Sequence, residues 1–172
     1  MQSTKMIVDI FRHMAWADAV VWRAVLDHPQ AEKDTKCKEI LYHYHATQHA
    51  FFLVWQNLPL DGIPEITGFD AMKDLAEWGR GYHEKVMTYL GHIKESDMNR
   101  SILLPWSGYI EKHLGKIPED PTLEDTMLQV VMHTMHHRGQ VNARLRAIGV
   151  IPELVDYIAW IWIGKPDAVW PA

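Results

Sequence analysis

Two histidines four residues apart, His133 and His137, have the spacing that points most directly to chemistry. Residues at this spacing lie one turn apart on the same face of a helix, so both imidazoles can reach one metal ion from a rigid support. His136 lies on the other side of such a helix, towards solvent, and is not expected to be a ligand. The pair predicts a divalent-metal site with His133 and His137 as two of its ligands.

The spacing alone is a weak signal, because the chain contains 11 histidines. Chance gives roughly 0.7 pairs of this spacing in such a chain, and a second pair, His45 and His49, is present. The direction of the side chains strengthens the case for a metal site at the first pair, since His137 falls on the apolar stripe of its helix and His133 lies beside that stripe. A buried imidazole needs a partner, so the alternatives are a metal ion or hydrogen bonds within the core.

Four long helices are expected to position these residues. Apolar residues recur at steps of three and four in four segments, namely Met6 to Leu26, about Thr35 to Leu58, about Phe69 to Ile93, and Thr122 to about Gly149. Thr122 and Asp125 form a helix-start signal, and Gly149 is a stop signal. The pattern predicts an all-α protein, a four-helix bundle formed by a single domain over residues 1–172.

The connections between these helices differ in length and composition. Residues 57–68 contain two prolines and two glycines and are expected to form a loop. Residues 97–121 form a long connection before the fourth helix, which could run back along the bundle or cover one end, and its apolar run at 102–106 could be a strand. The aromatic-rich C-terminal tail, residues 150–172, is expected to pack against the bundle.

A catalytic metal site of this type needs a third protein ligand and an open position. The second helix offers His43 and His45, about 100° to either side of its apolar centre, and His49 further out. Periodicity does not choose between the first two. Cys37 is a softer candidate, but near a helix start it is expected to be a passive small residue. His83, the histidine of the third helix, has charged neighbours and is expected at the surface.

Other residues carry weaker expectations. His13 is expected to be a solvated surface residue. Arg138 is expected to cap a helix or to pair with an acid on a neighbouring helix, in preference to contacting substrate, and Gly139 to allow close helix packing. Gly79 and Gly81 are expected to weaken the middle of the third helix.

Composition excludes several classes of protein. The net charge of -5 and the absence of a basic stripe argue against nucleic-acid binding. One cysteine, Cys37, fits a reducing cytoplasm, and no signal peptide is expected. The longest apolar run, residues 157–163, is too short to cross a membrane. The 8 tryptophans favour a large aromatic core over pocket walls, and exposed aromatic patches would suit a homodimer.

Three sequence blocks resemble the DinB-like (DNA-damage-inducible) family of metal-dependent four-helix-bundle enzymes. They are MAWAD at 14–18, KEILYH at 38–43 and HTMHHRGQ at 133–140. The last block is specific, the other two are weak alone, and the resemblance covers most of the chain. It implies that His43, His133 and His137 hold a divalent metal ion, with His45 as the alternative to His43.

The resemblance also implies an activity. Relatives include thiol-dependent transferases and isomerases, so we expect an S-transferase, or a related hydrolase or isomerase, that uses a low-molecular-weight thiol on a small-molecule substrate. Three imidazoles suit Zn, Ni or Fe(II). The alternatives are a non-catalytic, metal-stabilised bundle that binds a ligand or is associated with stress, and a metal-free bundle with hydrogen-bonded core histidines.

Overall fold

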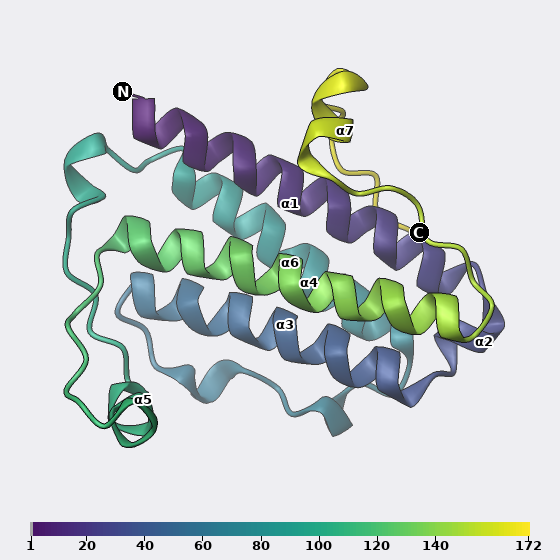
Figure 1. Ribbon diagram of the computed structural model, residues 1–172, viewed down its shortest axis with the longest axis horizontal. Helices are drawn as coiled ribbons and strands as arrows, with labels where there is room; N and C mark the ends of the chain where they lie inside the picture. Colours follow the sequence, from purple (N-terminus) through teal and green to yellow (C-terminus); the bar gives the residue numbers. More distant parts are fainter. Residues whose placement is uncertain (1) are drawn as a thin grey trace.

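Four long helices make up most of the described chain, residues 2–172 of a computed structural model (Figure 1). They are α1 (Gln2–Leu26), α3 (Thr35–Trp55), α4 (Met72–Leu90) and α6 (Leu123–Ala147). The all-helical class is confirmed, since the described residues contain no β-strand. The predicted helix boundaries differ from these by no more than four residues, because helix ends depend on caps and not on periodicity.

Capping residues explain where α3 begins and where α6 begins and ends. Asp34 precedes α3, and its Oδ1 accepts a hydrogen bond from the Cys37 backbone nitrogen at 2.8 Å. Thr122 and Asp125 form the predicted capping box at the start of α6. Beyond its end, Gly149 adopts φ +84°, a left-handed conformation that suits glycine.

The long helices pack side by side, α3 against α6 and α4, and α1 against α6 and α4. The short helix α2 (Pro29–Glu32) joins α1 to α3 at one end (Figure 1). Helices α3 and α4 then run in the same direction, so residues 56–71 travel back along the outside of the helices (Figure 1). That segment is the predicted loop, and it contains the 3₁₀ turns η1 (Leu60–Gly62) and η2 (Ile66–Gly68).

The connection from α4 to α6 lies across one end of the helices, one of the two predicted paths (Figure 1). It contains the 3₁₀ turn η3 (Glu95–Asp97) and the helix α5 (Ser107–Leu114). The predicted strand at 102–106 is wrong. Within the described residues, the only β-pairing is the isolated bridge between Ser101 and Thr122, with the Ile102 nitrogen donating to the Pro121 carbonyl at 2.8 Å. Pro105 has no N–H with which to extend that pairing.

The C-terminal tail packs against the helices, as predicted. Its helix α7 (Tyr157–Trp162) directs Trp160 inward, where the ring is fully buried and its Nε1 donates to the Pro166 carbonyl at 2.9 Å. Lys165 forms an ion pair with Asp9 of α1 at 2.5 Å. No helix within residues 2–172 combines the length and apolar character needed to cross a membrane.

Besides a small cluster formed by Trp16, Ala17, Val20 and Trp160, the core contains two large apolar clusters, one towards each end of the long helices. One contains Phe11, Trp55, Val86 and Leu123. The other contains Trp22, Leu41, Leu75 and Leu145. On α1, α3 and α6, buried polar residues lie between the positions that belong to these two clusters, and on α4 His83 directly follows Tyr82 of the first cluster. We call these residues the polar layer: Asp18, His45, Gln48, His83, Thr134 and Arg138.

Candidate metal centre

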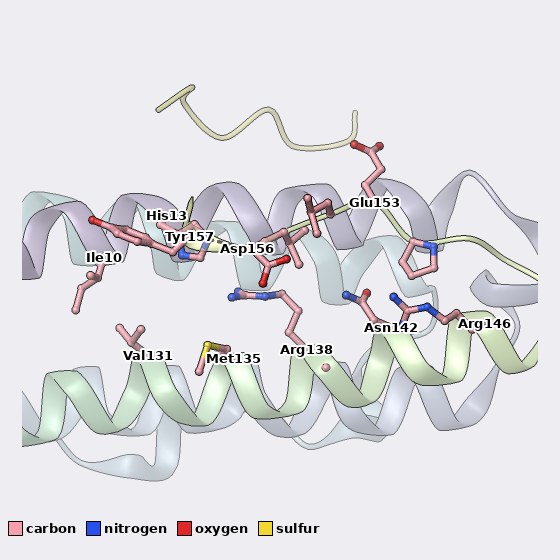
Figure 2. Close-up of a pocket in the computed structure, with 14 residues that line it drawn as sticks. Ile10, His13, Val131, Met135, Arg138, Asn142, Arg146, Glu153, Asp156 and Tyr157 are labelled. Atoms are coloured by element: carbon pink, nitrogen blue, oxygen red, sulfur yellow. Dashed lines mark hydrogen bonds between the residues drawn. The ribbon is translucent and has the colours of Figure 1, made fainter. Parts of the chain in front are cut away.

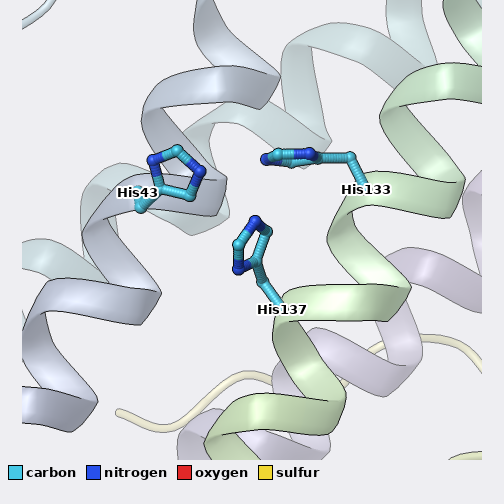
Figure 3. A group of neighbouring side chains, drawn as sticks. All are labelled: His43, His133 and His137. Atoms are coloured by element: carbon cyan, nitrogen blue, oxygen red, sulfur yellow. The ribbon is translucent and has the colours of Figure 1, made fainter.

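The structure brings three predicted residues together between α3 and α6. The candidate ligand nitrogens of His43, His133 and His137 all lie within 4.8 Å of one another. The ring centroid of His43 lies 5.1 Å from that of His133 and 4.5 Å from that of His137, and the last two are 4.3 Å apart. Figure 3 shows the three rings turned towards a common point. This group of residues could hold a metal ion.

Local geometry explains how the sequence produces this group. His133 and His137 are one turn apart on α6, and α6 packs along α3, which supplies His43. The Nδ1–H of His137 donates to Gln140 Oε1 at 2.8 Å, an arrangement that leaves Nε2 of His137 with a free lone pair. The Gln140 amide in turn donates to His136 at 3.0 Å. His136 itself is exposed, as predicted.

One nitrogen in this group is buried without a partner. Nε2 of His133 makes no hydrogen bond to any of the described residues, which is costly for a buried polar atom. Burial, with the nearby His137, lowers the pKa of His133 to about 4. Burial likewise lowers the pKa of His43. Neutral imidazoles with an unused nitrogen are suitable ligands for a divalent metal ion, so the residues present fit such an ion.

His45, the alternative to His43, lies elsewhere. It is fully buried in the polar layer, and both of its ring nitrogens are hydrogen-bonded. Nε2 accepts from Trp22 Nε1 at 2.8 Å, and Nδ1 donates to Gln48 Oε1 at 2.7 Å. Burial lowers the pKa of His45 to about 3, so the ring is neutral. Since neither nitrogen is free, His45 is a hydrogen-bonded core histidine.

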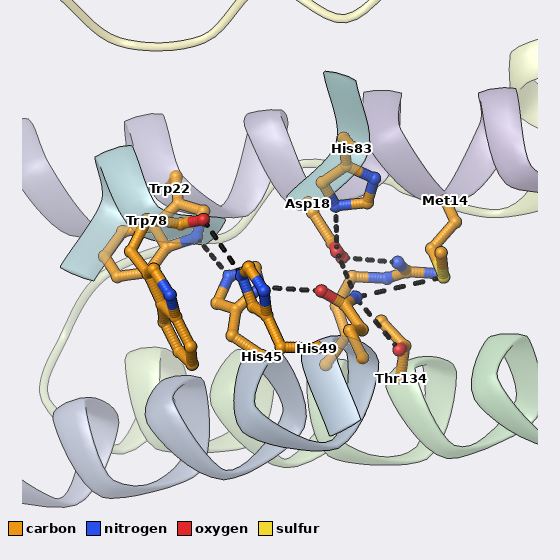
Figure 4. Close-up of polar contacts among 10 residues, drawn as sticks. Met14, Asp18, Trp22, His45, His49, Trp78, His83 and Thr134 are labelled. Carbon is orange, nitrogen blue, oxygen red and sulfur yellow. Dashed lines mark hydrogen bonds and ion pairs between the residues drawn. The ribbon is translucent and has the colours of Figure 1, made fainter. Parts of the chain in front are cut away.

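The polar layer converges on one buried carboxylate, Asp18 (Figure 4). Asp18 Oδ2 accepts from Gln48 at 3.1 Å and from His83 Nε2 at 3.0 Å, and Oδ1 pairs with Arg138 Nη1 at 2.8 Å. Burial would raise the pKa of Asp18, but the His83 hydrogen bond and the Arg138 charge outweigh it and hold that pKa well below its usual range. Gln48 also donates to Thr134 at 3.1 Å.

Asp18, His45 and His83 form a second group whose ligand atoms lie within 4.8 Å of one another. A cation there would have to compete with the Arg138 guanidinium for Asp18, and with Trp22 and Gln48 for His45. We therefore interpret this group as a structural network that joins α1, α3, α4 and α6. The predicted pairing of Arg138 with an acid on a neighbouring helix is confirmed.

Two histidines expected at the surface are buried. His13 is only 6% exposed, because its Nε2 bonds the Val155 carbonyl at 3.0 Å and the rings of the tail cover it. His83 is 3% exposed, and its ring packs 5.4 Å from the Trp170 ring. Both predictions are wrong. The C-terminal tail covers His13, and helix periodicity contains no information about the tail. His83 points into the bundle, where its Nε2 bonds Asp18 of α1, and the tail closes over it.

The expectations for the glycines of α4 and α6 also need correction. A Cβ at Gly139 would have no atom within 4 Å, so close helix packing does not occur there. At Gly79 a Cβ would lie 2.5 Å from Cε1 and Nε2 of His45. Gly79 is therefore required for the fit of the polar layer, a role that is not apparent from its helix propensity.

Sequence reasoning missed Asp18, Gln48 and His83 as members of one network. A signal was present for two of them. Asp18 follows Met14 by four residues and precedes Val21 by three, and Gln48 lies between Tyr44 and Phe51 at the same steps. A polar residue on an apolar stripe indicates a buried hydrogen-bond network.

A scan against models of protein families found no match, and neither did searches of curated proteins and of solved structures. The resemblance to the DinB-like family thus stays a prediction based on the three sequence blocks.

Proposed function

We propose that this chain is a divalent-metal-binding protein of the DinB-like type, a four-helix bundle in which His43, His133 and His137 hold the ion. Its proposed activity is that of a thiol-dependent S-transferase, or of a related hydrolase or isomerase. The single observation that carries the proposal is the convergence of three imidazoles from two helices, one of them with a buried nitrogen that lacks a partner.

The neighbouring residues support this assignment. The hydrogen bond from His137 to Gln140 holds the ring so that Nε2 faces the other two histidines. Three protein ligands leave at least one coordination position for water or substrate. When bound, a divalent ion would supply Lewis acidity and stabilise the thiolate form of a thiol. His43 is exposed, so a small molecule can reach the site from solvent.

The position of the ligands on two different helices also supports a second candidate function. Because the ligands come from both α3 and α6, a bound ion would also tie these helices together. A non-catalytic, metal-stabilised bundle needs only this metal link between α3 and α6. An enzyme also needs a coordination position on the ion at which water and substrate can exchange. Both proposals therefore predict metal binding, but only the enzyme would convert a substrate.

Metal analysis tests the proposal directly. Purified protein is loaded with Zn²⁺, Ni²⁺ or Fe²⁺, desalted, and measured by inductively coupled plasma mass spectrometry. We expect about one ion per chain in the wild type and loss of it in His133→Ala. His136→Ala is the matched control, since His136 is exposed on the same helix and should keep the ion. Equal metal content in the wild type and His133→Ala would refute the site.

A transfer assay then separates the two functions. The metal-loaded protein is incubated with a low-molecular-weight thiol and a chloronitrobenzene, and the thioether is followed by absorbance. Turnover that disappears in His133→Ala supports the transferase. A loaded protein whose melting temperature falls on chelation, and which turns over no thiol in a panel of such compounds, supports the metal-stabilised bundle.

A further inference from the structure

A cavity of about 510 Å³ lies on the side of α6 opposite to the three histidines. It is bounded by α6, by α1 and by the start of the C-terminal tail, residues 152–157 (Figure 2). At about 100° per residue, Met135, Arg138 and Asn142 lie on the face of α6 turned away from His133 and His137. None of the three metal-site histidines lines this cavity. Its size is in the range of small-molecule sites.

The floor of the cavity contains an unsatisfied polar group. Asn142 is only 8% exposed and lines the cavity, yet its Oδ1 is buried and has no hydrogen-bond partner. Leaving such an acceptor unpaired destabilises the protein. An N–H or O–H donor on a ligand would satisfy it once the amide turns this oxygen, which is closed to solvent, towards the cavity.

Hydrogen-bond donors lie beside this acceptor. Arg138 makes one hydrogen bond within the described residues, from Nη1 to Asp18, although its guanidinium has five N–H groups. Figure 2 shows the guanidinium extended into the cavity beneath Asp156. Arg146 adds a second guanidinium at the rim. The floor and rim can therefore bind a carboxylate.

Negative and apolar groups complete the cavity. Asp156 and Glu153 are exposed carboxylates of the tail that line it. Since Asp18 neutralises Arg138, these two acids face one uncompensated cation, Arg146. A purely anionic ligand is disfavoured by this balance. Val131 and Met135 provide an apolar wall.

We propose that this cavity binds a small zwitterion with an apolar side group, the chemistry of an apolar amino acid. The ammonium group would donate to Asn142 Oδ1 and face the carboxylates of the tail. The carboxylate would accept from the free N–H groups of Arg138 and Arg146, and the side group would contact Val131 and Met135. This site is independent of the proposed metal centre and extends the function beyond it.

Gly139 provides a direct way to block the cavity. It lines the cavity, and a Cβ there meets no atom within 4 Å, so a large side chain can be added without a clash at its base. Gly139→Trp places an indole at the cavity and replaces glycine by a better helix former. Gly81→Trp is the matched control, because Gly81 is also helical with open space around its Cβ and lies outside the cavity.

Isothermal titration calorimetry of the full chain with L-leucine, L-methionine and L-phenylalanine tests the proposal. We expect at least one to bind the wild type and Gly81→Trp equally, and to bind Gly139→Trp at least tenfold more weakly. For L-phenylalanine, 2-phenylethylamine and 3-phenylpropanoate each lack one charged group and should bind at least tenfold more weakly. The proposal is overturned if none of the three amino acids binds, or if Gly139→Trp retains wild-type affinity.

A second variant tests the role of the unpaired acceptor. Asn142→Leu removes Oδ1 without removing a hydrogen bond within the protein, so its melting temperature should equal or exceed that of the wild type. Its amino-acid affinity should fall at least tenfold, with unchanged metal content. Unchanged affinity in Asn142→Leu would contradict the assignment of this residue, whatever the result of the metal analysis.

Discussion

At the scale of single residues, the role of each histidine is decided by what its two ring nitrogens contact. His45 uses both nitrogens within the core, and His137 uses Nδ1 on Gln140. His133 leaves a buried Nε2 without a partner. The same residue type therefore serves as a core hydrogen-bonding group in one place and as a candidate metal ligand in another.

Gln140 is predicted to be a positioning residue for the metal centre. Gln140→Leu removes the acceptor that orients His137, so metal affinity should fall roughly 10- to 100-fold. Competition with a chromogenic chelator measures this change. Gln140→Glu keeps an acceptor oxygen at the same position and should retain affinity close to that of the wild type. If Gln140→Leu binds metal as tightly as the wild type, the hydrogen bond has no part in the site.

Gly79 is predicted to be sterically required. A methyl group there would lie against the buried His45 ring, so Gly79→Ala should lower the free energy of unfolding by about 1–3 kcal/mol. Gly81→Ala, two residues along the same helix with open space, should raise it by about 0.5–1 kcal/mol. Urea denaturation measures both. A Gly79→Ala protein as stable as Gly81→Ala would show that the His45 ring moves aside freely.

At the scale of elements, Asp34 links the start of α3 to the end of α6. Its carboxylate caps α3 through the Cys37 nitrogen and pairs with Arg144 of α6 at 2.6 Å. The Arg144 hydrogen bond is the main reason that the pKa of Asp34 is lowered from 3.8 to about 2. One side chain thus sets a helix start and the contact between the two helices that hold the candidate ligands.

This contact predicts a pH-dependent stability. Because the folded-state pKa of Asp34 is lowered, its charge stabilises the fold fully above pH 3.8, and that contribution is lost as the pH falls towards 2. Asp34→Asn keeps a capping oxygen and loses the charge, so it should be less stable than the wild type at pH 7, and the difference should shrink as the pH falls through about 2. Asp34→Ala should lose about 1 kcal/mol more at pH 7, through the cap. Urea titrations between pH 2 and 7 check both, and a difference between wild type and Asp34→Asn that does not depend on pH would contradict the account.

At the scale of the whole molecule, the C-terminal tail completes the structure. It covers His13 and His83, carries the buried Trp160, and forms one side of the proposed amino-acid cavity. Other apolar side chains of α7, Ile158, Ile161 and Trp162, remain exposed. The homodimer expected from the sequence stays a prediction, which light scattering on the purified chain would check.

The two tryptophans of α7 should differ sharply in their effect on stability. Trp160→Ala removes a fully buried ring, so the free energy of unfolding should fall by about 3–5 kcal/mol. Trp162→Ala is the matched control, since this side chain is 76% exposed and its removal should change stability by no more than about 0.5 kcal/mol. Chemical denaturation followed by far-ultraviolet circular dichroism measures both. Equal values for the two variants would show that the tail contributes little to the fold.

The sequence by itself determined the all-helical class, the extent of the four long helices and the inward direction of His133 and His137. These features depend on local periodicity and capping, and both are encoded within a few turns of chain. The pairing of Arg138 with an acid was one of two roles expected for it from the sequence, and its burial came from the structure.

Only the tertiary structure decided which histidine of α3 approaches α6. His43 and His45 lie at equal angles from the apolar centre of their helix, and the neighbour that packs against each side distinguishes them. His43 faces α6, whereas His45 faces Trp22 of α1 and Gly79 of α4. The burial of His13 was likewise decided by a tail 142 residues away along the chain, and that of His83 by Asp18 of α1 together with the same tail. Periodicity records which face of a helix is buried, but it does not record which element buries it.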